Sequence, residues 1–133
     1  MAERYFTAAE ANELLPVVRP LAEELVARRR SLAVATVRHA RIATKIAGNG
    51  GGVRPHEVDE LRAAIDTEAA AVARCVEELQ SLGVLVKDLD EGLVDFPARL
   101  DDQEVLLCWR LGEPEVAFWH GFDEGFAGRK PLP

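Results

Sequence analysis

A cluster of glycines constrains the fold of this chain more than any other feature of its sequence. Four of the five residues 48–52 are glycine, and a backbone with that much conformational freedom does not stay helical. The segments on either side both carry apolar residues at alternating steps of three and four, the spacing of a helix with one buried stripe. The first stripe comprises Val18, Leu21, Leu25, Leu32, Ala35, Ile42 and Ile46, with Arg28 and His39 at two of its positions. The second comprises Val58, Leu61, Ile65, Ala69, Val72, Val76, Leu79 and Leu82. Helices joined by a short connection pack antiparallel, so the sequence predicts a helical hairpin over residues 7–82 with a Gly-rich loop at 48–52.

The start of the first helix combines a capping signal with two prolines. Thr7 and Glu10 have the spacing of a capping box, which places the first helical residue at Ala8. Pro16 and Pro20 each remove an amide hydrogen and crowd the carbonyl four residues earlier. We therefore expect a short first helix, a break or kink at residues 12–16, and then a long helix ending near Ala47.

After Gly83 the pattern changes from helices to strands bounded by turn residues. We expect a four-stranded antiparallel sheet over residues 84–120, with strands at 84–87, 93–96, 104–110 and 115–119. A turn at Gly112 and Glu113 would place Arg110 opposite Glu115, as an ion pair, and Leu107 opposite Phe118.

That register predicts which residues share each face of the sheet, because strand side chains alternate. One face would hold Val105, Leu107, Trp109, Val116, Phe118 and His120. The other would hold Leu106, Cys108, Ala117 and Trp119, so Cys108 and His120 would lie on opposite faces. Both faces are apolar, so the second must be covered by the chain's own tail, a ligand or another subunit. We favour the tail, residues 121–133, with Phe122 and Phe126 packing down.

Together these features predict a single α+β domain over residues 1–133. It would consist of a long antiparallel helical hairpin with a kinked first helix, a small four-stranded antiparallel sheet, and an ordered C-terminal tail. A chain of 133 residues can bury a core of this kind.

Charge and composition narrow the classes of partner and the compartment. The net charge of −7 argues against a general nucleic-acid binder. No apolar run approaches the roughly 18 to 20 residues needed to cross a bilayer, and residues 1–6 lack the build of a signal peptide. Cys75 and Cys108 form no CxxC motif and are expected to be reduced thiols. We therefore expect a soluble, cytoplasmic protein without a membrane partner.

The charges are unevenly distributed along the chain. Residues 1–54 carry a net charge of +4 and residues 55–133 a net charge of −11, and no carboxylate occurs between Leu25 and His56. The plain interpretation is a basic helix that faces an acidic one. The alternative is a face that binds an anionic partner through Arg28, Arg29, Arg38, Arg41 and Lys45.

Four segments resemble one bacterial family, the domain of unknown function 2203. They are FTAAEANELLP at residues 6–16, VKDLDEGLVDFP at 86–97, CWRLGEP at 108–114 and WHGFDEGFAGR at 119–129. The resemblance spans essentially the whole chain. It implies membership of that family and brings with it neither an activity nor catalytic residues.

The densest group of functional side chains lies at residues 119–129. His120 with Asp123 and Glu124 could ligate a divalent metal ion, with Asp95 or Glu113 supplied by a neighbouring strand. The plainer alternative is that His120 is structural and hydrogen-bonds Asp123 or a backbone carbonyl. Further candidate ligand or interface residues are Trp109, Arg110, Trp119 and Arg129.

Two functional hypotheses follow. The first is a non-enzymatic binding or assembly module that forms a homodimer, because a two-helix hairpin buries only one stripe of each helix and the sheet is apolar on both faces. In a variant of this hypothesis, the chain binds another protein. The second is a small metal-dependent enzyme or metal-binding protein that uses His120 with nearby carboxylates. Nucleophilic catalysis has little support, since neither Ser31 nor Ser81 lies in a nucleophile elbow.

Overall fold

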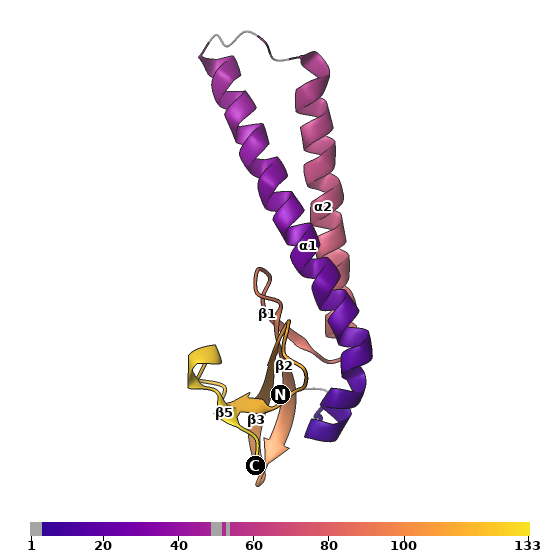
Figure 1. Ribbon diagram of the computed structural model, residues 1–133, viewed down its shortest axis with the longest axis vertical. Coiled ribbons are helices and arrows are strands. Elements are labelled where there is room, and N and C mark those ends of the chain that lie inside the picture. The colour runs from indigo at the N-terminus through magenta and orange to yellow at the C-terminus, as the bar shows by residue number, and fades with distance from the viewer. Residues whose placement is uncertain (1–3, 49–51, 53) are drawn as a thin grey trace.

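The computed structural model describes residues 4–48, 52 and 54–133, which form two helices and an antiparallel sheet (Figure 1). The helices are α1 (Ala8–Ala47) and α2 (Pro55–Ser81). The strands are β1 (Leu85–Asp88), β2 (Leu93–Leu100), β3 (Gln103–Arg110), β4 (Phe118–His120) and β5 (Lys130–Pro131), with a short 3-10 helix, η1 (Phe126–Gly128), before β5. The α+β fold with a helical hairpin is confirmed. Most of the predicted Gly-rich loop, residues 49–51, lies outside the described residues. Neither helix has a stretch long and apolar enough to cross a membrane.

The first helix is continuous, so the predicted break or kink near its prolines takes the form of a bend, and no separate short helix precedes it (Figure 1). The capping box is confirmed, because the Glu10 amide donates to Thr7 Oγ1 (3.1 Å) and the Thr7 amide donates to Glu10 Oε1 (2.9 Å). Pro16 and Pro20 lie within α1 on its exposed side. Each proline removes one helical hydrogen bond, while the buried side chains of Ala11, Leu15, Val18 and Ala22 hold this segment against the core. The first turns bend away from the axis of the remaining helix (Figure 1).

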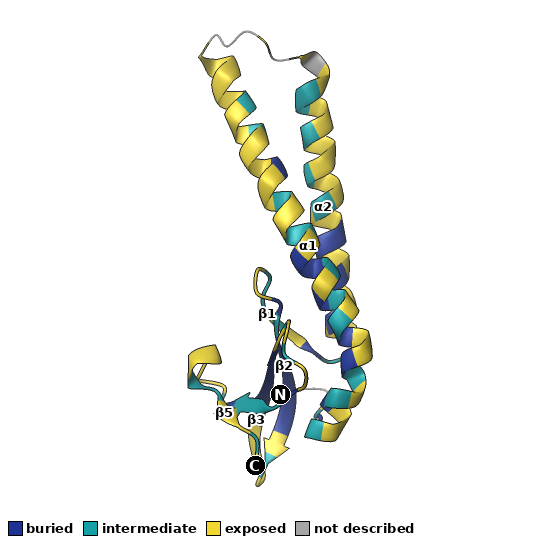
Figure 2. Ribbon diagram, in the orientation of Figure 1, coloured by how far each residue is buried: buried dark blue, intermediate teal, exposed yellow. Residues whose placement is uncertain are grey.

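The hairpin is well packed only in the half that adjoins the sheet. Val18, Ala22 and Leu25 of α1 join Val72, Cys75 and Leu79 of α2 in the core. Two ion pairs link the helices, Arg28–Glu68 (3.3 Å) and Glu24–Arg74 (2.8 Å). Beyond Ala35 the described part of α1 has no buried residue, and the two helices separate toward the loop (Figures 1 and 2). The distal half of the hairpin therefore projects from the molecule.

The sheet has five strands rather than four, in the order β1-β2-β3-β4-β5, and every neighbouring pair is antiparallel. The extra strand is β5, which the tail adds at the edge of β4. Residues 94–98 and 105–109 are all buried, so both faces of β2 and β3 are covered. One face packs on the helices through Val94, Phe96, Ala98, Val105, Leu107 and Trp109.

The predicted register between β3 and β4 is wrong by one residue. Leu107 lies opposite Trp119, and Cys108 opposite Phe118. The reason is a connection longer than a two-residue turn, over residues 111–117, in which Glu113 accepts hydrogen bonds from the Arg110 amide and from Trp109 Nε1. A slip of one residue moves every side chain of a strand to the other face. His120 and Cys108 therefore share a face, contrary to the prediction.

The same change of register removes the predicted ion pair between Arg110 and Glu115. The Arg110 guanidinium instead approaches Glu91 at 3.7 Å. The chain after residue 115 is held elsewhere, because Asn12 of α1 binds both the amide and the carbonyl of Val116 (2.7 and 3.2 Å). These two bonds fix where the chain enters β4.

Candidate functional site

The candidate site lies on the face of the sheet turned away from the helices, which we call the tail face. It carries Asp95, Pro97, Leu106, Cys108, Phe118 and His120. Asp95 of β2 lies opposite Cys108 of β3, and β4 brings His120 beside them. These side chains are 1%, 0% and 3% exposed respectively. Three neighbouring strands thus place a carboxylate, a thiol and an imidazole together, with one ligand atom of each within 4.8 Å of the others.

The polar partners of His120 define the orientation of its ring. Nδ1 lies 2.8 Å from the carbonyl oxygen of Gly121. A carbonyl oxygen only accepts, so Nδ1 carries a hydrogen and donates it. Nε2 lies 3.2 and 3.1 Å from the two carboxylate oxygens of Asp95. One proton shared between Nε2 and Asp95 therefore satisfies both buried groups, which burial would otherwise make costly.

Burial also determines the protonation of Cys108. Burial raises the pKa of the Cys108 thiol to about 12, and the nearby charge of Asp95 acts in the same direction. The pKa of Asp95 is raised by burial as well, although the charge and hydrogen bond of His120 oppose this effect. Both ring nitrogens of His120 already have other partners, so the imidazole is not placed to deprotonate the thiol, and the Asp95 carboxylate beside it raises the pKa of the thiol rather than lowering it. Cys108 is therefore a thiol at neutral pH and is not arranged as a nucleophile.

A pocket of about 250 Å³ opens above the Asp95–His120 pair. Its floor includes these two residues, and its apolar walls are Leu93, Leu106, Phe122 and Phe126. Lys87 and Glu124 supply its other charged groups. The predicted packing of the tail is only partly observed, because the tail covers this face while Phe122 and Phe126 both remain exposed. The result is a small hollow between the sheet and the tail.

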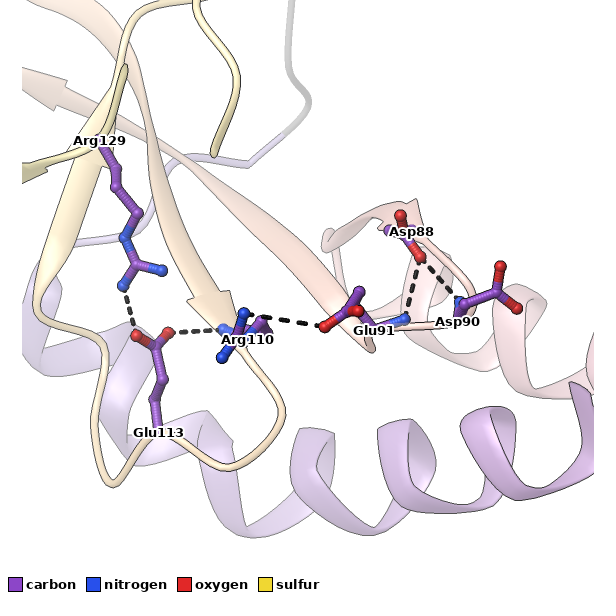
Figure 3. A network of polar contacts seen from close by, with 6 residues as sticks. All are labelled: Asp88, Asp90, Glu91, Arg110, Glu113 and Arg129. Carbon is purple, nitrogen blue, oxygen red and sulfur yellow. Dashed lines mark hydrogen bonds and ion pairs between the residues drawn. The ribbon is translucent and has the colours of Figure 1, made fainter. Parts of the chain in front are cut away.

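The residues predicted as metal ligands are only partly brought together. Asp95 and His120 are in direct contact, and Glu124 lines the same pocket. Glu124 Oε1 accepts hydrogen bonds from the Gly121 amide and from Lys130 Nζ, each at 3.0 Å. Asp123 is exposed, and no contact with His120 is found for it among the described residues. Glu113 lies in the 111–117 connection, beside Arg110 and Arg129 (Figure 3), and does not line the pocket.

Cys108 is the one member of the group Asp95, Cys108 and His120 that the sequence did not predict as a site residue. Alternation from a two-residue turn placed it on the wrong face, and the bonds that lengthen the connection involve Asn12, which is remote in sequence. The available signal was Asp95, a charged residue between apolar Val94 and Phe96 in a strand. A carboxylate in that position needs buried polar partners, and Cys108 is its direct neighbour across the strands.

The remaining candidates mostly hold the tail and the 111–117 connection onto the sheet (Figure 3). The Arg129 guanidinium lies 3.8 Å from the Phe118 ring centre and 4.5 Å from that of Phe126, and it donates to Glu113 Oε2 at 2.5 Å. Trp109 is fully buried. Arg110 lies on the exposed surface, and half-buried Trp119 is covered by Lys130.

Comparisons with known proteins leave the interpretation of this site to its geometry. The model of a family described as an uncharacterized conserved protein matches residues 4–132 of the chain. No curated protein and no solved structure matches the chain.

Proposed function

We propose that this chain, which belongs to the DUF2203 family of uncharacterized conserved proteins, is a binding module for a small organic anion. The anion would occupy the pocket above Asp95 and His120. The observation that carries this proposal is a buried ionisable pair on the floor of a pocket whose lining combines apolar side chains with two further charged ones. Ligand sites commonly combine apolar walls with a few placed polar groups.

The sign of the ligand's charge follows from the charges around the pocket. Asp95 and His120 share one proton and compensate each other. Glu124 is compensated by Lys130, whose Nζ lies 3.0 Å from its carboxylate. Lys87 is the remaining charged residue of the lining, and among the described residues it has no ion-pair partner. An anionic group beside Lys87 would complete the charge balance.

The size and the walls of the pocket favour an anion with a short apolar body. A volume of about 250 Å³ corresponds to roughly eight water molecules at liquid density. The exposed rings of Phe122 and Phe126 offer apolar surface to a ligand, and covering that surface would favour binding. Benzoate has this combination of charge, size and shape.

Benzoate is expected to bind, and Lys87→Gln is expected to weaken binding about tenfold. The loss of one charge-assisted hydrogen bond is worth roughly 1.5 to 3 kcal/mol when fully formed, and less at an exposed rim. Amide chemical shifts recorded during a benzoate titration would report both the site and the affinity. The matched control is Lys45→Gln, a lysine in the last turn of α1, which should leave the affinity unchanged. Binding of neutral benzamide as tightly as benzoate would contradict the proposal.

A second candidate function is self-assembly through the distal half of the hairpin. Val34, Val37 and Ile46 are 59%, 51% and 55% exposed there. This part of α1 is basic, whereas the neighbouring part of α2 exposes Asp59, Glu60 and Asp66. A second copy packed antiparallel would place α1 of one chain against α2 of the other, so that opposite charges meet.

Light scattering at micromolar concentration is expected to give twice the mass of one chain. A double substitution, Val34→Lys with Val37→Lys, is expected to return the mass to that of a single chain, because it adds charge to the apolar positions. Val17→Lys is the matched control, since Val17 is an exposed valine in the other half of α1. A single-chain mass for the unmodified protein would exclude this assembly.

A further inference from the structure

We propose that Asp95, Cys108 and His120 form a binding site for one divalent metal ion of the zinc class. This inference goes beyond anion binding and does not depend on it. The three donors come from adjacent strands, their ligand atoms lie within 4.8 Å of one another, and all three residues are buried. A rigid sheet therefore holds a carboxylate, a thiol and an imidazole at one point.

The orientation of His120 is the one that a metal ligand requires. Its Nδ1 hydrogen is donated to the Gly121 carbonyl at 2.8 Å. In metal sites the non-ligating ring nitrogen usually donates to a carboxylate, a backbone carbonyl or a water molecule, which fixes the ring and its tautomer. Nε2 is left as the inward-facing nitrogen, directed at Asp95.

The separation between His120 and Asp95 also suits two ligands of one ion. Nε2 lies 3.1 and 3.2 Å from the carboxylate oxygens. Two ligands bound at about 2.0 to 2.1 Å in tetrahedral geometry lie roughly 3.3 Å apart. A zinc ion could thus replace the proton that the two residues share, with little movement of either side chain.

Cys108 determines the class of metal. Thiolate and imidazole ligands favour zinc and related transition metals over magnesium and calcium, which prefer oxygen ligands alone. The thiol is protonated when no metal is present, and binding would replace its proton. Asp95 and His120 also line the pocket, so an ion held by three protein ligands could keep a further position for water or for a ligand in that pocket.

Cobalt(II) substituted for zinc gives a direct test on the whole chain. A metal-stripped sample titrated with cobalt is expected to bind about one ion and to develop the near-ultraviolet absorption of a cobalt–thiolate bond. About two protons should be released per ion, one from Cys108 and one from the Asp95–His120 pair. A pH indicator in weak buffer would measure this release.

Two cysteine variants separate a ligand role from a general effect on the fold. Cys108→Ser should abolish the thiolate absorption and weaken cobalt binding at least a hundredfold. Cys75→Ser is the matched control, because Cys75 is equally buried but lies on α2, and it should retain both. Asp123→Asn should also retain both, since that side chain lies outside the cluster. Equal absorption in Cys108→Ser and in the unmodified protein would overturn the proposal.

X-ray absorption of the zinc-loaded, unmodified protein gives a result that needs no variant. One sulfur ligand at about 2.3 Å, with nitrogen or oxygen ligands at about 2.0 Å, is expected. Failure to bind cobalt or zinc, or zinc bound without sulfur, would overturn the metal site. Benzoate titration of the metal-free protein tests the anion proposal separately, so the failure of one is distinguishable from the failure of the other.

Discussion

Asp95→Ala is expected to lower the free energy of unfolding by about 3 to 5 kcal/mol, the cost typical of breaking a buried ion pair. The substitution would leave His120 Nε2 buried without its carboxylate partner, in a site where both residues are at most 3% exposed. It would also remove the acceptor beside the Cys108 thiol. Urea unfolding of the metal-free protein at neutral pH, followed by circular dichroism, measures the change.

Two further variants test whether the loss comes from the pair itself. Asp123→Ala removes an exposed carboxylate of the tail and should change the free energy of unfolding by less than about 0.5 kcal/mol. His120→Ala combined with Asp95→Ala should cost clearly less than the sum of the single changes, because the two side chains share one interaction. Additive losses, or a loss below about 1 kcal/mol for Asp95→Ala, would show that the pair is not coupled.

Trp109→Ala is expected to cost about 3 to 5 kcal/mol of stability, as large-to-small changes of buried aromatic residues do. Trp109 is fully buried among the core residues that join the sheet to the helices. Its Nε1 donates to the Glu113 carbonyl at 3.1 Å, so the ring also fixes the 111–117 connection. The substitution would leave a large cavity and release this connection. Thermal and urea unfolding would measure the loss.

Trp119→Ala provides the comparison for this effect within the same sheet. Trp119 is only half-buried, with Lys130 covering its ring at 4.6 Å, so its replacement should cost roughly half as much or less. Trp109→Phe should preserve part of the packing while losing the bond to Glu113. An equal loss for the alanine variants of both tryptophans would contradict the assignment of Trp109 as the main core residue of the pair.

The helical part of the fold could be predicted because its signals are local. The Thr7–Glu10 capping box fixed the first residue of α1, and the glycine cluster separated two apolar stripes of helical spacing. The prolines were harder to interpret. A proline interrupts an isolated helix, but here the buried faces of Ala11, Leu15 and Val18 compensate for the missing hydrogen bonds. That compensation depends on tertiary contacts, which sequence periodicity does not contain.

The site could be predicted only in part, for a different reason. Asp95 and His120 were both candidates, and the structure brings them into contact. Cys108 joins them only when β3 and β4 have the observed register. That register depends on the length of the 111–117 connection and on Asn12, which lies more than a hundred residues earlier and binds both backbone groups of Val116. A single strand pairing, set by a distant side chain, thus decided the composition of the cluster.

The projecting hairpin has a consequence for how local stability is distributed in this molecule. A helix of 40 residues extends about 60 Å at 1.5 Å per residue, and the buried positions of α1 end at Ala35. The turns beyond that point have few tertiary contacts, so they can open and close without disturbing the sheet. A partner that binds these turns must order them, and part of the favourable binding free energy then offsets the conformational entropy that is lost. Substitutions that raise or lower helix propensity beyond Ala35 are thus expected to change the affinity for such a partner. They would leave Asp95, Cys108 and His120 on the tail face unchanged.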